Sequence, residues 1–377
     1  TADARGPLGE VVNLVNASPL AGLTNHVLAR ATATGNVVNF GETGMVAREE
    51  WWYPEYMEER CPGLPDWHAL LNCADAFPSP ETAPNGRYLG GPVTWGGYDE
   101  ERIQALNLPF EVVHAGTDAA LYAELQAAYE RQDPILLWVP QPHWAPAKYK
   151  GKFDDGYEAY RTWVLARMIE KGVVPFIKID KGLEDEANGV QMMKPMPELD
   201  ALLAKSKSLG VYGTKERSVI NSANREGIAA VVKQQFEVGN QVLAHGMMPM
   251  IEPEVNIKSE TRAECDAILL DEILKNLAAL PEGTQVMLKL SLPVVPGTFD
   301  PLVSHPKVLR VVALSGGYKR PEACVELSKN AGIIASFSRA LLEDLRHQMT
   351  DAEFDAALAG AIDEIYTGST KKIPVPA

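Results

Sequence analysis

Four charged residues recur at one spacing in the second half of the chain, and this spacing constrains the fold more than any other feature. Lys178, Lys215, Glu252 and Lys289 are each 37 residues apart, and each closes a short apolar run that predicts a β-strand. Long amphipathic stretches, which predict helices, separate these runs. Repeated strand–helix units predict a parallel sheet, and six units of this length favour a (β/α) barrel of the TIM type over an open sheet.

The predicted elements of this part alternate along the chain. The strands are Val173–Ile179, Val211–Thr214, Met248–Ile251, Val286–Leu292, Val308–Leu314 and Ile333–Phe337. The clearest helices between them are Pro197–Lys207, Arg225–His245 and Thr261–Leu280.

Side chains alternate along a strand, so each charged strand end carries more than one inward group. The residues that share a face are Lys178 with Asp180, Lys215 with Arg217, and Glu252 with Glu254. The strand around Lys289 has one wholly apolar face, so Lys289 points inward with Met287 and Ser291. Barrel enzymes hold their catalytic groups at the carboxyl ends of the strands. The alternative is a set of surface charges at a coincidental spacing.

The residue types at these strand ends suit one kind of chemistry. A lysine amine attacks a carbonyl group only when it is neutral, and a desolvated lysine beside another cation loses its proton more readily. Lys289 beside Lys215 fits that description. The carbinolamine that forms must lose water, which requires a proton donor and acceptor, and Glu252 and Glu254 suit that role.

Two loops after the last predicted strands suit phosphate binding. Ser315-Gly316-Gly317 follows the fifth strand, and Ser338-Arg339 opens the helix after the sixth. Barrels commonly bind phosphate at these two loops through backbone N–H groups, a helix N-terminus and a guanidinium.

Six blocks between residues 171 and 372 resemble class I fructose-bisphosphate aldolase, and most closely its short bacterial form. They are VVPFIKIDKGLEDEANGVQMMKP, YGTKERSVI, MIEPEV, VMLKLSLP, RVVALSGGY and IASFSRALLEDL, in the family's order. The resemblance implies cleavage of fructose 1,6-bisphosphate to dihydroxyacetone phosphate and glyceraldehyde 3-phosphate. It implies no metal and no cofactor, because the iminium is the electron sink, and it leaves a homo-oligomer open.

The resemblance also implies roles for the site residues. Lys289 forms the Schiff base, and Glu252, with Glu254 beside it, is the acid and base for dehydration and for C3–C4 cleavage. It implies that Lys215 and Arg217 hold the second phosphate and the reacting hydroxyls, and that Lys178 supports the same pocket. The residues that it implies for the first phosphate are Ser315, Gly316, Gly317, Ser338 and Arg339. The family begins with a strand that carries a Leu-Asp-Gln-Ser-Gly-Gly-Ser block, whose Asp orients the substrate, and a second strand follows. Neither is recognisable in this chain, so we expect six of the eight barrel strands.

Composition divides the chain in two. All seven Trp lie at or before Trp163, whereas the first Lys is Lys148 and eighteen more follow it. We therefore expect an N-terminal α/β lobe over residues 1–150, a junction over 151–171 and the barrel portion over 172–377. The net charge of −15 argues against nucleic acid as a partner, and no apolar run is long enough to span a membrane. The four Cys have no metal-ligand spacing, so we expect plain thiols.

The N-terminal part predicts one βαβ unit, with strands at Phe110–Ala115 and Pro134–Val139 and a helix at Thr117–Arg131. Its many Trp side chains suit a cage for a methylated ammonium group, bound through cation–π attraction, or else serve as core and surface anchors.

Five blocks of this part resemble one lobe of the periplasmic substrate-binding proteins for glycine betaine, choline and trimethylamine N-oxide. They are EEWWYPEYMEE, PGLPDWHALL, GRYLGGPVTW, FEVVHAGTDAAL and PILLWVPQPHWAPAKY, over residues 41–149. The resemblance implies Trp52, Trp95 and Trp144 as cage candidates. Such proteins close two lobes over the ligand, and at most a fragment of the other lobe lies in residues 1–40.

The two resemblances leave several readings open. The chain is either a designed chimera or a misjoined sequence, and it acts as an aldolase, as a methylated-amine binding module, or as an inactive composite. The aldolase resemblance implies the cytoplasm, and the N-terminal resemblance implies the periplasm. A further hypothesis places the βαβ unit Phe110–Val139 in the two vacant barrel positions.

Overall fold

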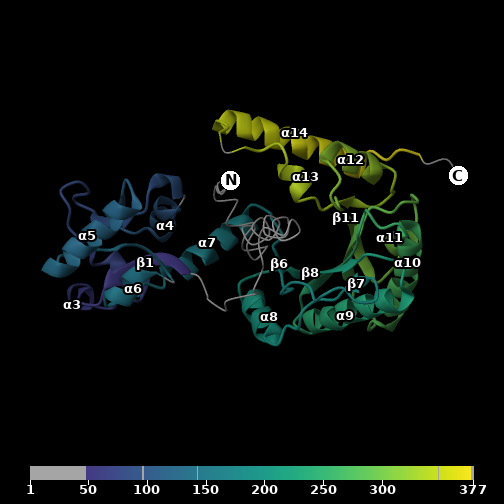
Figure 1. Ribbon diagram of the computed structural model, residues 1–377, viewed down its shortest axis with the longest axis horizontal. Coiled ribbons are helices and arrows are strands. Elements are labelled where there is room, and N and C mark those ends of the chain that lie inside the picture. The colour runs from purple at the N-terminus through teal and green to yellow at the C-terminus, as the bar shows by residue number, and fades with distance from the viewer. Residues whose placement is uncertain (1–47, 96, 142, 347, 375–377) are drawn as a thin grey trace, which may run out of the picture. The chain divides into compact units, whose positions relative to one another are not determined.

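The computed structural model describes residues 48–374 except 96, 142 and 347, and the chain divides into two compact units between Gly172 and Val173 (Figure 1). The N-terminal unit is a mixed five-stranded sheet with helices, and the C-terminal unit is a larger parallel sheet with helices. Among the described residues, no helix is long and apolar enough to cross a membrane.

The N-terminal sheet has the strand order β3-β2-β4-β1-β5. Strand β2 is parallel to β3 and β4, and β1 is antiparallel to β4 and β5. The strands are β1 (Arg48–Pro54), β2 (Gly86–Gly90), β3 (Phe110–His114), β4 (Leu137–Gln141) and β5 (Gly151–Phe153). The helices are α3 (Met57–Arg60), α4 (Asp99–Leu106), α5 (Asp118–Arg131), α6 (Trp144–Lys148) and α7 (Gly156–Glu170), with short 3-10 turns η1 (Trp67–Leu71), η2 (Ala74–Ala76) and η3 (Val93–Trp95).

The predicted βαβ unit is present as β3, α5 and β4, but β2 lies between its two strands. Because β3 and β4 belong to the N-terminal sheet, the hypothesis that they complete the barrel is wrong. Two buried clusters pack on this sheet. Trp51, Tyr88 and Tyr160 belong to one, and Trp52 and Leu121 to the other.

A disulfide joins Cys61, just after α3, to Cys73, just before η2. The prediction of plain thiols is therefore wrong for this pair, whereas Cys265 and Cys324 are free and buried. Cys61 is fully buried and Cys73 nearly so. Between these two cysteines the chain is irregular except for η1. The disulfide therefore restrains a segment that has little regular hydrogen-bonded structure of its own.

The C-terminal sheet confirms the expected portion of a (β/α) barrel. Six parallel strands follow the order β12-β11-β10-β9-β8-β6 and curve around one concave face, and β7 pairs antiparallel with β8 (Figure 1). The strands are β6 (Phe176–Lys178), β7 (Val190–Gln191), β8 (Gly213–Ile220), β9 (Met248–Val255), β10 (Val286–Ser291), β11 (Val308–Leu314) and β12 (Ile334–Ala335). The helices are α8 (Leu199–Ser208), α9 (Arg225–Ala244), α10 (Arg262–Ala279), α11 (Asp300–Val303), α12 (Arg320–Ser328), α13 (Arg339–Leu342) and α14 (Asp351–Thr370).

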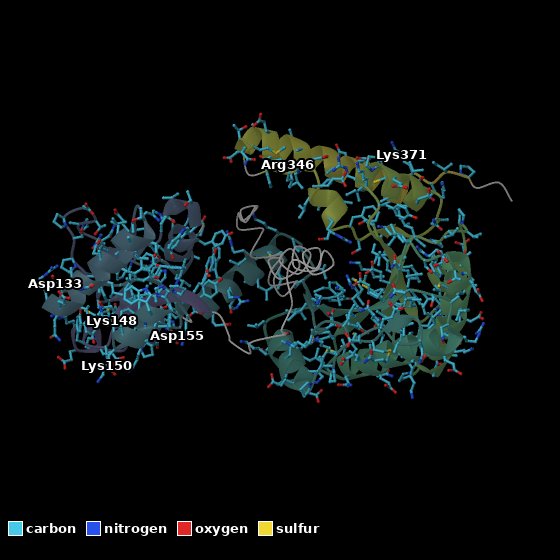
Figure 2. All side chains as sticks on the ribbon, viewed as in Figure 1. Asp133, Lys148, Lys150, Asp155, Arg346 and Lys371 are labelled. Carbon is cyan, nitrogen blue, oxygen red and sulfur yellow. A yellow bond between two sulfur atoms is a disulfide. The ribbon has the colours of Figure 1, made fainter. Side chains whose placement is uncertain are left out.

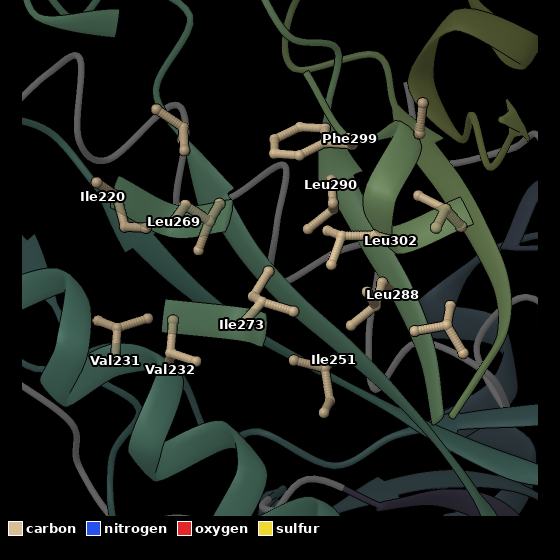
Figure 3. Close-up of a cluster of buried hydrophobic side chains, with 14 of the residues drawn as sticks. Ile220, Val231, Val232, Ile251, Leu269, Ile273, Leu288, Leu290, Phe299 and Leu302 are labelled. Atoms are coloured by element: carbon tan, nitrogen blue, oxygen red, sulfur yellow. The ribbon is translucent and has the colours of Figure 1, made fainter. Parts of the chain in front are cut away.

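The core of this unit lies between the strands and the helices (Figure 3). Leu288 and Leu290 of β10 pack there with Ile251 of β9 and with residues of α9 and α10 such as Val231 and Ile273. Their burial confirms that the apolar face of β10 meets the helices. The intervening residues of β10, Lys289 among them, therefore point to the concave face.

We expect the disulfide to stabilise the N-terminal unit by about 3 kcal/mol, because it closes a loop with a sequence separation of 12 residues. The Cys73→Ala variant, or the wild type with reductant, should lose this free energy of unfolding. Since every Trp lies in residues 51–163, tryptophan fluorescence during urea unfolding reports this unit alone.

The matched control is Cys324→Ala, which removes a buried free thiol from the C-terminal unit. It should leave the fluorescence transition unchanged. An equal midpoint for the wild type and Cys73→Ala would show that the disulfide adds no stability.

Candidate active site

Charged side chains such as Lys148, Lys150, Arg346 and Lys371 project into solvent (Figure 2). The charged side chains at the carboxyl ends of β6, β8, β9 and β10 differ, because most of them are buried or half-buried and paired. Burying charge is unfavourable unless each charge has a partner, so such a cluster indicates a functional site.

Glu252 is the centre of this cluster. Its carboxylate forms one ion pair with Lys289, at 3.2 Å between Nζ and Oε1, and another with Lys215, at 2.8 Å between Nζ and Oε2. The Glu252 side chain is 5% exposed, and the two lysines are 14% and 15% exposed. The Glu252 carboxylate thus links Lys215 and Lys289, so three of the four residues that recur every 37 positions are in direct contact.

Strand register produces this arrangement. Lys178 pairs with Lys215 across β6 and β8, and Arg217 pairs with Glu252 across β8 and β9. Because parallel strands end at the same edge, a constant spacing in sequence becomes a row of neighbouring side chains in space.

Two further ion pairs flank the centre. Lys178 Nζ lies 2.6 Å from Asp180 Oδ1, and Arg217 NH1 lies 3.4 Å from Glu254 Oε2. The cluster therefore contains four basic and three acidic groups, and this excess of positive charge suits an anionic ligand. Arg217 is the most exposed of these groups, so it can turn toward a ligand.

The two loops predicted to bind phosphate follow neighbouring strands. β11 pairs with β12, so Ser315 and Ser338 lie beyond adjacent strand ends. Gly316 and Gly317 have φ values of +62° and +110°, which favour glycine, and a Cβ on Gly316 would lie 2.7 Å from Ile257. Arg339 is exposed at the start of α13 and forms no ion pair with a described residue. The backbone can therefore approach a ligand closely here, with a guanidinium nearby.

Sequence reasoning missed one buried carboxyl group directly behind the site. Glu216 lies between Lys215 and Arg217 on the outward face of β8 and is fully buried. Burial raises its pKa well above the usual range; the Lys215 ammonium opposes this shift, and the carboxylates of Asp180 and Glu252 add to it. Neither Glu216 oxygen forms a hydrogen bond of standard geometry with a described residue, although the nearby Thr214 hydroxyl also opposes the shift. The sequence signal that could have identified Glu216 was the alternation of basic and acidic residues in Lys215-Glu216-Arg217.

The three Trp predicted to form a cage lie in different surroundings. Trp52 on β1 is buried in the core, Trp95 packs against Trp138 with ring centroids 4.9 Å apart, and Trp144 packs against Tyr122 at 5.2 Å. Among the described residues, no ring contact joins the three predicted members to one another. Trp95 and Trp144 are 36% and 46% exposed, so both can contact a ligand.

Metal-ligating side chains are also dispersed. Over residues 48–374, apart from the three undescribed positions, no group of three or more His, Cys, Asp or Glu side chains could hold a metal ion.

Comparisons with known proteins bear on both units. Residues 18–161 match the family model for the substrate binding domain of ABC-type glycine betaine transport systems. The chain is 52% identical over 199 residues to the class 1 fructose-bisphosphate aldolase of Synechocystis sp., a match that covers 53% of this chain and 66% of the relative. It is 50% identical over 202 residues to the enzyme of that name from Porphyromonas gingivalis, covering 54% of this chain and 68% of the relative. The chain thus spans about two thirds of the length of these curated relatives.

Among solved structures, the chain is similar to a fructose-bisphosphate aldolase from Plasmodium falciparum, with 18% identity and a TM-score of 0.47. That match covers 56% of this chain and 73% of the other. The two resemblances indicated by the sequence blocks are confirmed by the curated relatives and the family model.

We expect Glu216→Gln to stabilise the C-terminal unit increasingly as the pH rises. A carboxyl group with a raised pKa stays protonated in the folded chain while the unfolded chain releases its proton above about pH 4.3, so stability falls as the pH rises toward the raised value. Each unit of difference between the two pKa values corresponds to about 1.4 kcal/mol. The glutamine of the Glu216→Gln variant does not titrate, so the variant does not lose this stability as the pH rises.

Urea unfolding followed by circular dichroism at pH 5 and pH 8 measures the effect, with tryptophan fluorescence identifying the transition of the other unit. If the difference between variant and wild type is the same at both pH values, Glu216 does not have a raised pKa.

Proposed function

We propose that this chain, which belongs to the class 1 fructose-bisphosphate aldolase family, is a Schiff-base aldolase whose active site is the charged cluster of the C-terminal unit. The substrate is fructose 1,6-bisphosphate, and the products are dihydroxyacetone phosphate and glyceraldehyde 3-phosphate. The observation that carries the proposal is the single carboxylate of Glu252 between Lys289 and Lys215.

In the first half of the reaction, the Lys289 ammonium passes a proton to the Glu252 carboxylate, and the neutral amine then attacks the C2 carbonyl of the substrate and forms a carbinolamine. Glu252, within 3.2 Å of that amine, donates a proton to the departing hydroxyl group, so water leaves and an iminium remains. Lys215, paired with the second oxygen of Glu252, holds the carboxyl group in place.

In the second half, the iminium accepts the electron pair of the breaking C3–C4 bond and becomes an enamine. The Glu252 carboxylate takes the proton of the C4 hydroxyl, and glyceraldehyde 3-phosphate leaves. Protonation of the enamine at C3 and hydrolysis of the resulting iminium release dihydroxyacetone phosphate and restore the Lys289 amine. Glu254 beside Glu252 assists these proton transfers.

The remaining cluster residues bind the charged substrate. The phosphate on C1 lies against the loop Ser315–Gly317 and the start of α13, where backbone N–H groups and Arg339 are available. Lys178, Lys215 and Arg217 bind the second phosphate and the reacting hydroxyls. This assignment is supported by the net positive charge of the cluster and by the exposure of Arg217.

We expect borohydride to trap dihydroxyacetone phosphate on Lys289, because reduction makes the iminium linkage permanent. Peptide mass mapping should locate the adduct on the peptide that contains Lys289. The Lys289→Arg variant should lose the adduct, and Glu252→Gln should form it about a hundredfold more slowly, the scale of one acid–base group.

Lys307 provides the matched control. Its side chain is 14% exposed, like that of Lys289, and it also forms an ion pair with a glutamate, Glu282, at 3.3 Å. Lys307→Arg should leave trapping unchanged. A folded wild type that gives no adduct on Lys289, or equal labelling of Lys289 and Lys307, would contradict the proposed function.

For the N-terminal unit, we propose a second function, the binding of a methylated ammonium ligand such as glycine betaine. The family match supports it, and so does the exposed Trp95, which packs against the half-buried Trp138, because an aromatic face attracts a quaternary ammonium group.

Trimethylamine N-oxide or glycine betaine should change the tryptophan fluorescence in a saturable manner. Trp95→Ala should weaken binding about tenfold, which is the scale of a single cation–π contact in a partly desolvated site. Trp163→Ala removes an equally exposed ring from α7 and should leave the affinity unchanged. A fluorescence signal without saturation would mean that the unit does not bind these ligands.

We place the chain in the cytoplasm, as its aldolase family membership favours. A reducing compartment opens disulfides, so the Cys61–Cys73 bond would be lost there. The unfolding experiment with reductant therefore also measures how stable the N-terminal unit is under cytoplasmic conditions.

A further inference from the structure

The strand that carries Glu252 contains two prolines although it lies inside the sheet. β9 lies between β8 and β10, and it includes Pro249 and Pro253. Proline has no N–H to donate, so it normally occupies only edge strands, first positions or bulges. One side of β9 must therefore lack hydrogen bonds that a parallel sheet ordinarily has.

The missing donors face β10. Met248 N–H donates to the carbonyl oxygen of Tyr212, the residue just before β8, and Asn256 N–H donates to the carbonyl oxygen of Ile220, the last residue of β8. Successive backbone groups of a strand point to opposite neighbours, so even-numbered positions of β9 face β8 and odd-numbered positions face β10. The odd-numbered positions 249 and 253 are the prolines, which leaves Ile251 and Val255 as the donors toward β10.

The Ser291 hydroxyl replaces part of the backbone pairing at the boundary between β9 and β10. Val255 N–H donates to Ser291 Oγ at 3.0 Å, and the same hydroxyl donates to the Val255 carbonyl oxygen at 2.8 Å. Both residues are buried, so neither hydrogen bond has water as a competitor. Backbone pairing between β9 and β10 extends only from Met287–Met250 to Leu288–Ile251, so the hydroxyl fixes the two strands beyond the point where their ladder stops.

The boundary between β9 and β10 separates Glu252 from Lys289, and the proposed reaction depends on the distance between these two residues. Glu252 lies on β9, and Lys289 lies on β10, two residues before Ser291. We propose that Ser291 is a positioning residue, which sets the distance from Lys289 to Glu252 by joining the strands through its hydroxyl. The expected effect of Ser291 on kcat rests on the proposed function. Its expected effect on the ion pair between Lys289 and Glu252 rests on the geometry alone.

A separate contact holds the chain after Lys289 from the helix side. The Arg262 guanidinium donates to the Leu292 carbonyl at 2.7 Å, and Asp266 accepts a hydrogen bond from Val294 N–H at 3.0 Å. These contacts do not involve Ser291, so loss of its hydroxyl should leave the loop attached and the fold intact. The change should then be confined to the register of β9 and β10 at the active site.

The test compares Ser291→Thr with Ser291→Val. The two side chains have nearly the same shape, and only the first retains the hydroxyl, so steric effects cancel in the comparison. With fructose 1,6-bisphosphate, kcat should be at least tenfold lower for Ser291→Val, because a small misplacement of a catalytic pair is enough to slow the reaction this far. KM should differ by less than about threefold, since the proposed phosphate contacts come from other residues.

Ser328→Ala is the control. Ser328 is also buried, and its hydroxyl donates to the backbone carbonyl of Val325 at 2.7 Å on α12, away from β9 and β10. It should retain the wild-type kcat. Equal kcat values for Ser291→Thr and Ser291→Val in active enzymes would overturn the inference.

A second readout does not require the proposed activity. Formaldehyde with cyanoborohydride methylates lysine amines, and peptide mapping gives the rate for each lysine. Lys289 should react several times faster in Ser291→Val than in Ser291→Thr, because its ion pair with Glu252 is loosened, whereas Lys307 should react equally in both. Equal Lys289 rates would overturn the inference. Unequal rates in a chain whose wild type has no aldolase activity would overturn the proposed function alone.

Discussion

The C-terminal unit depends on one carboxylate that is shared between two ammonium groups. Glu252 is almost fully buried, and a lone charge there would be strongly unfavourable, so Lys215 and Lys289 must both remain within reach of it. Each of the three residues comes from a different strand, and only a parallel sheet in register brings those strand ends together. The electrostatic requirement and the fold therefore constrain each other: the sheet creates the cluster, and the cluster is stable only in a sheet with this register.

Much of this arrangement could be predicted from the sequence, because strand alternation and a constant spacing determine which side chains are neighbours. The strand bounds could not be predicted as well. β8 runs to Ile220, six residues beyond the expected end at Thr214, since the charged residues Lys215 to Arg217 resemble a loop until their inward orientation is known. β6 begins only at Phe176, because Pro175 has no N–H to donate to the sheet and because Val173 and Val174 are exposed.

Other features depended on contacts between residues that no spacing rule connects. The Cys61–Cys73 disulfide requires two side chains to meet across an irregular segment. The burial of Glu216 follows from the helix side of β8, and the pairing of Trp95 with Trp138 follows from the order of strands in a mixed sheet. In each case the sequence contains the residue types, but their partners depend on tertiary packing.

The prolines of β9 have a mechanical consequence. Strands in a sheet resist separation through their shared hydrogen bonds, and the β9–β10 boundary has fewer backbone donors than a parallel pair of this length ordinarily provides. Among the boundaries between the long strands β8, β9, β10 and β11, this one should therefore separate most easily under tension, since β8–β9 and β10–β11 are paired over their whole lengths. A boundary of low tensile strength thus passes between the proposed acid–base residue and the proposed nucleophile.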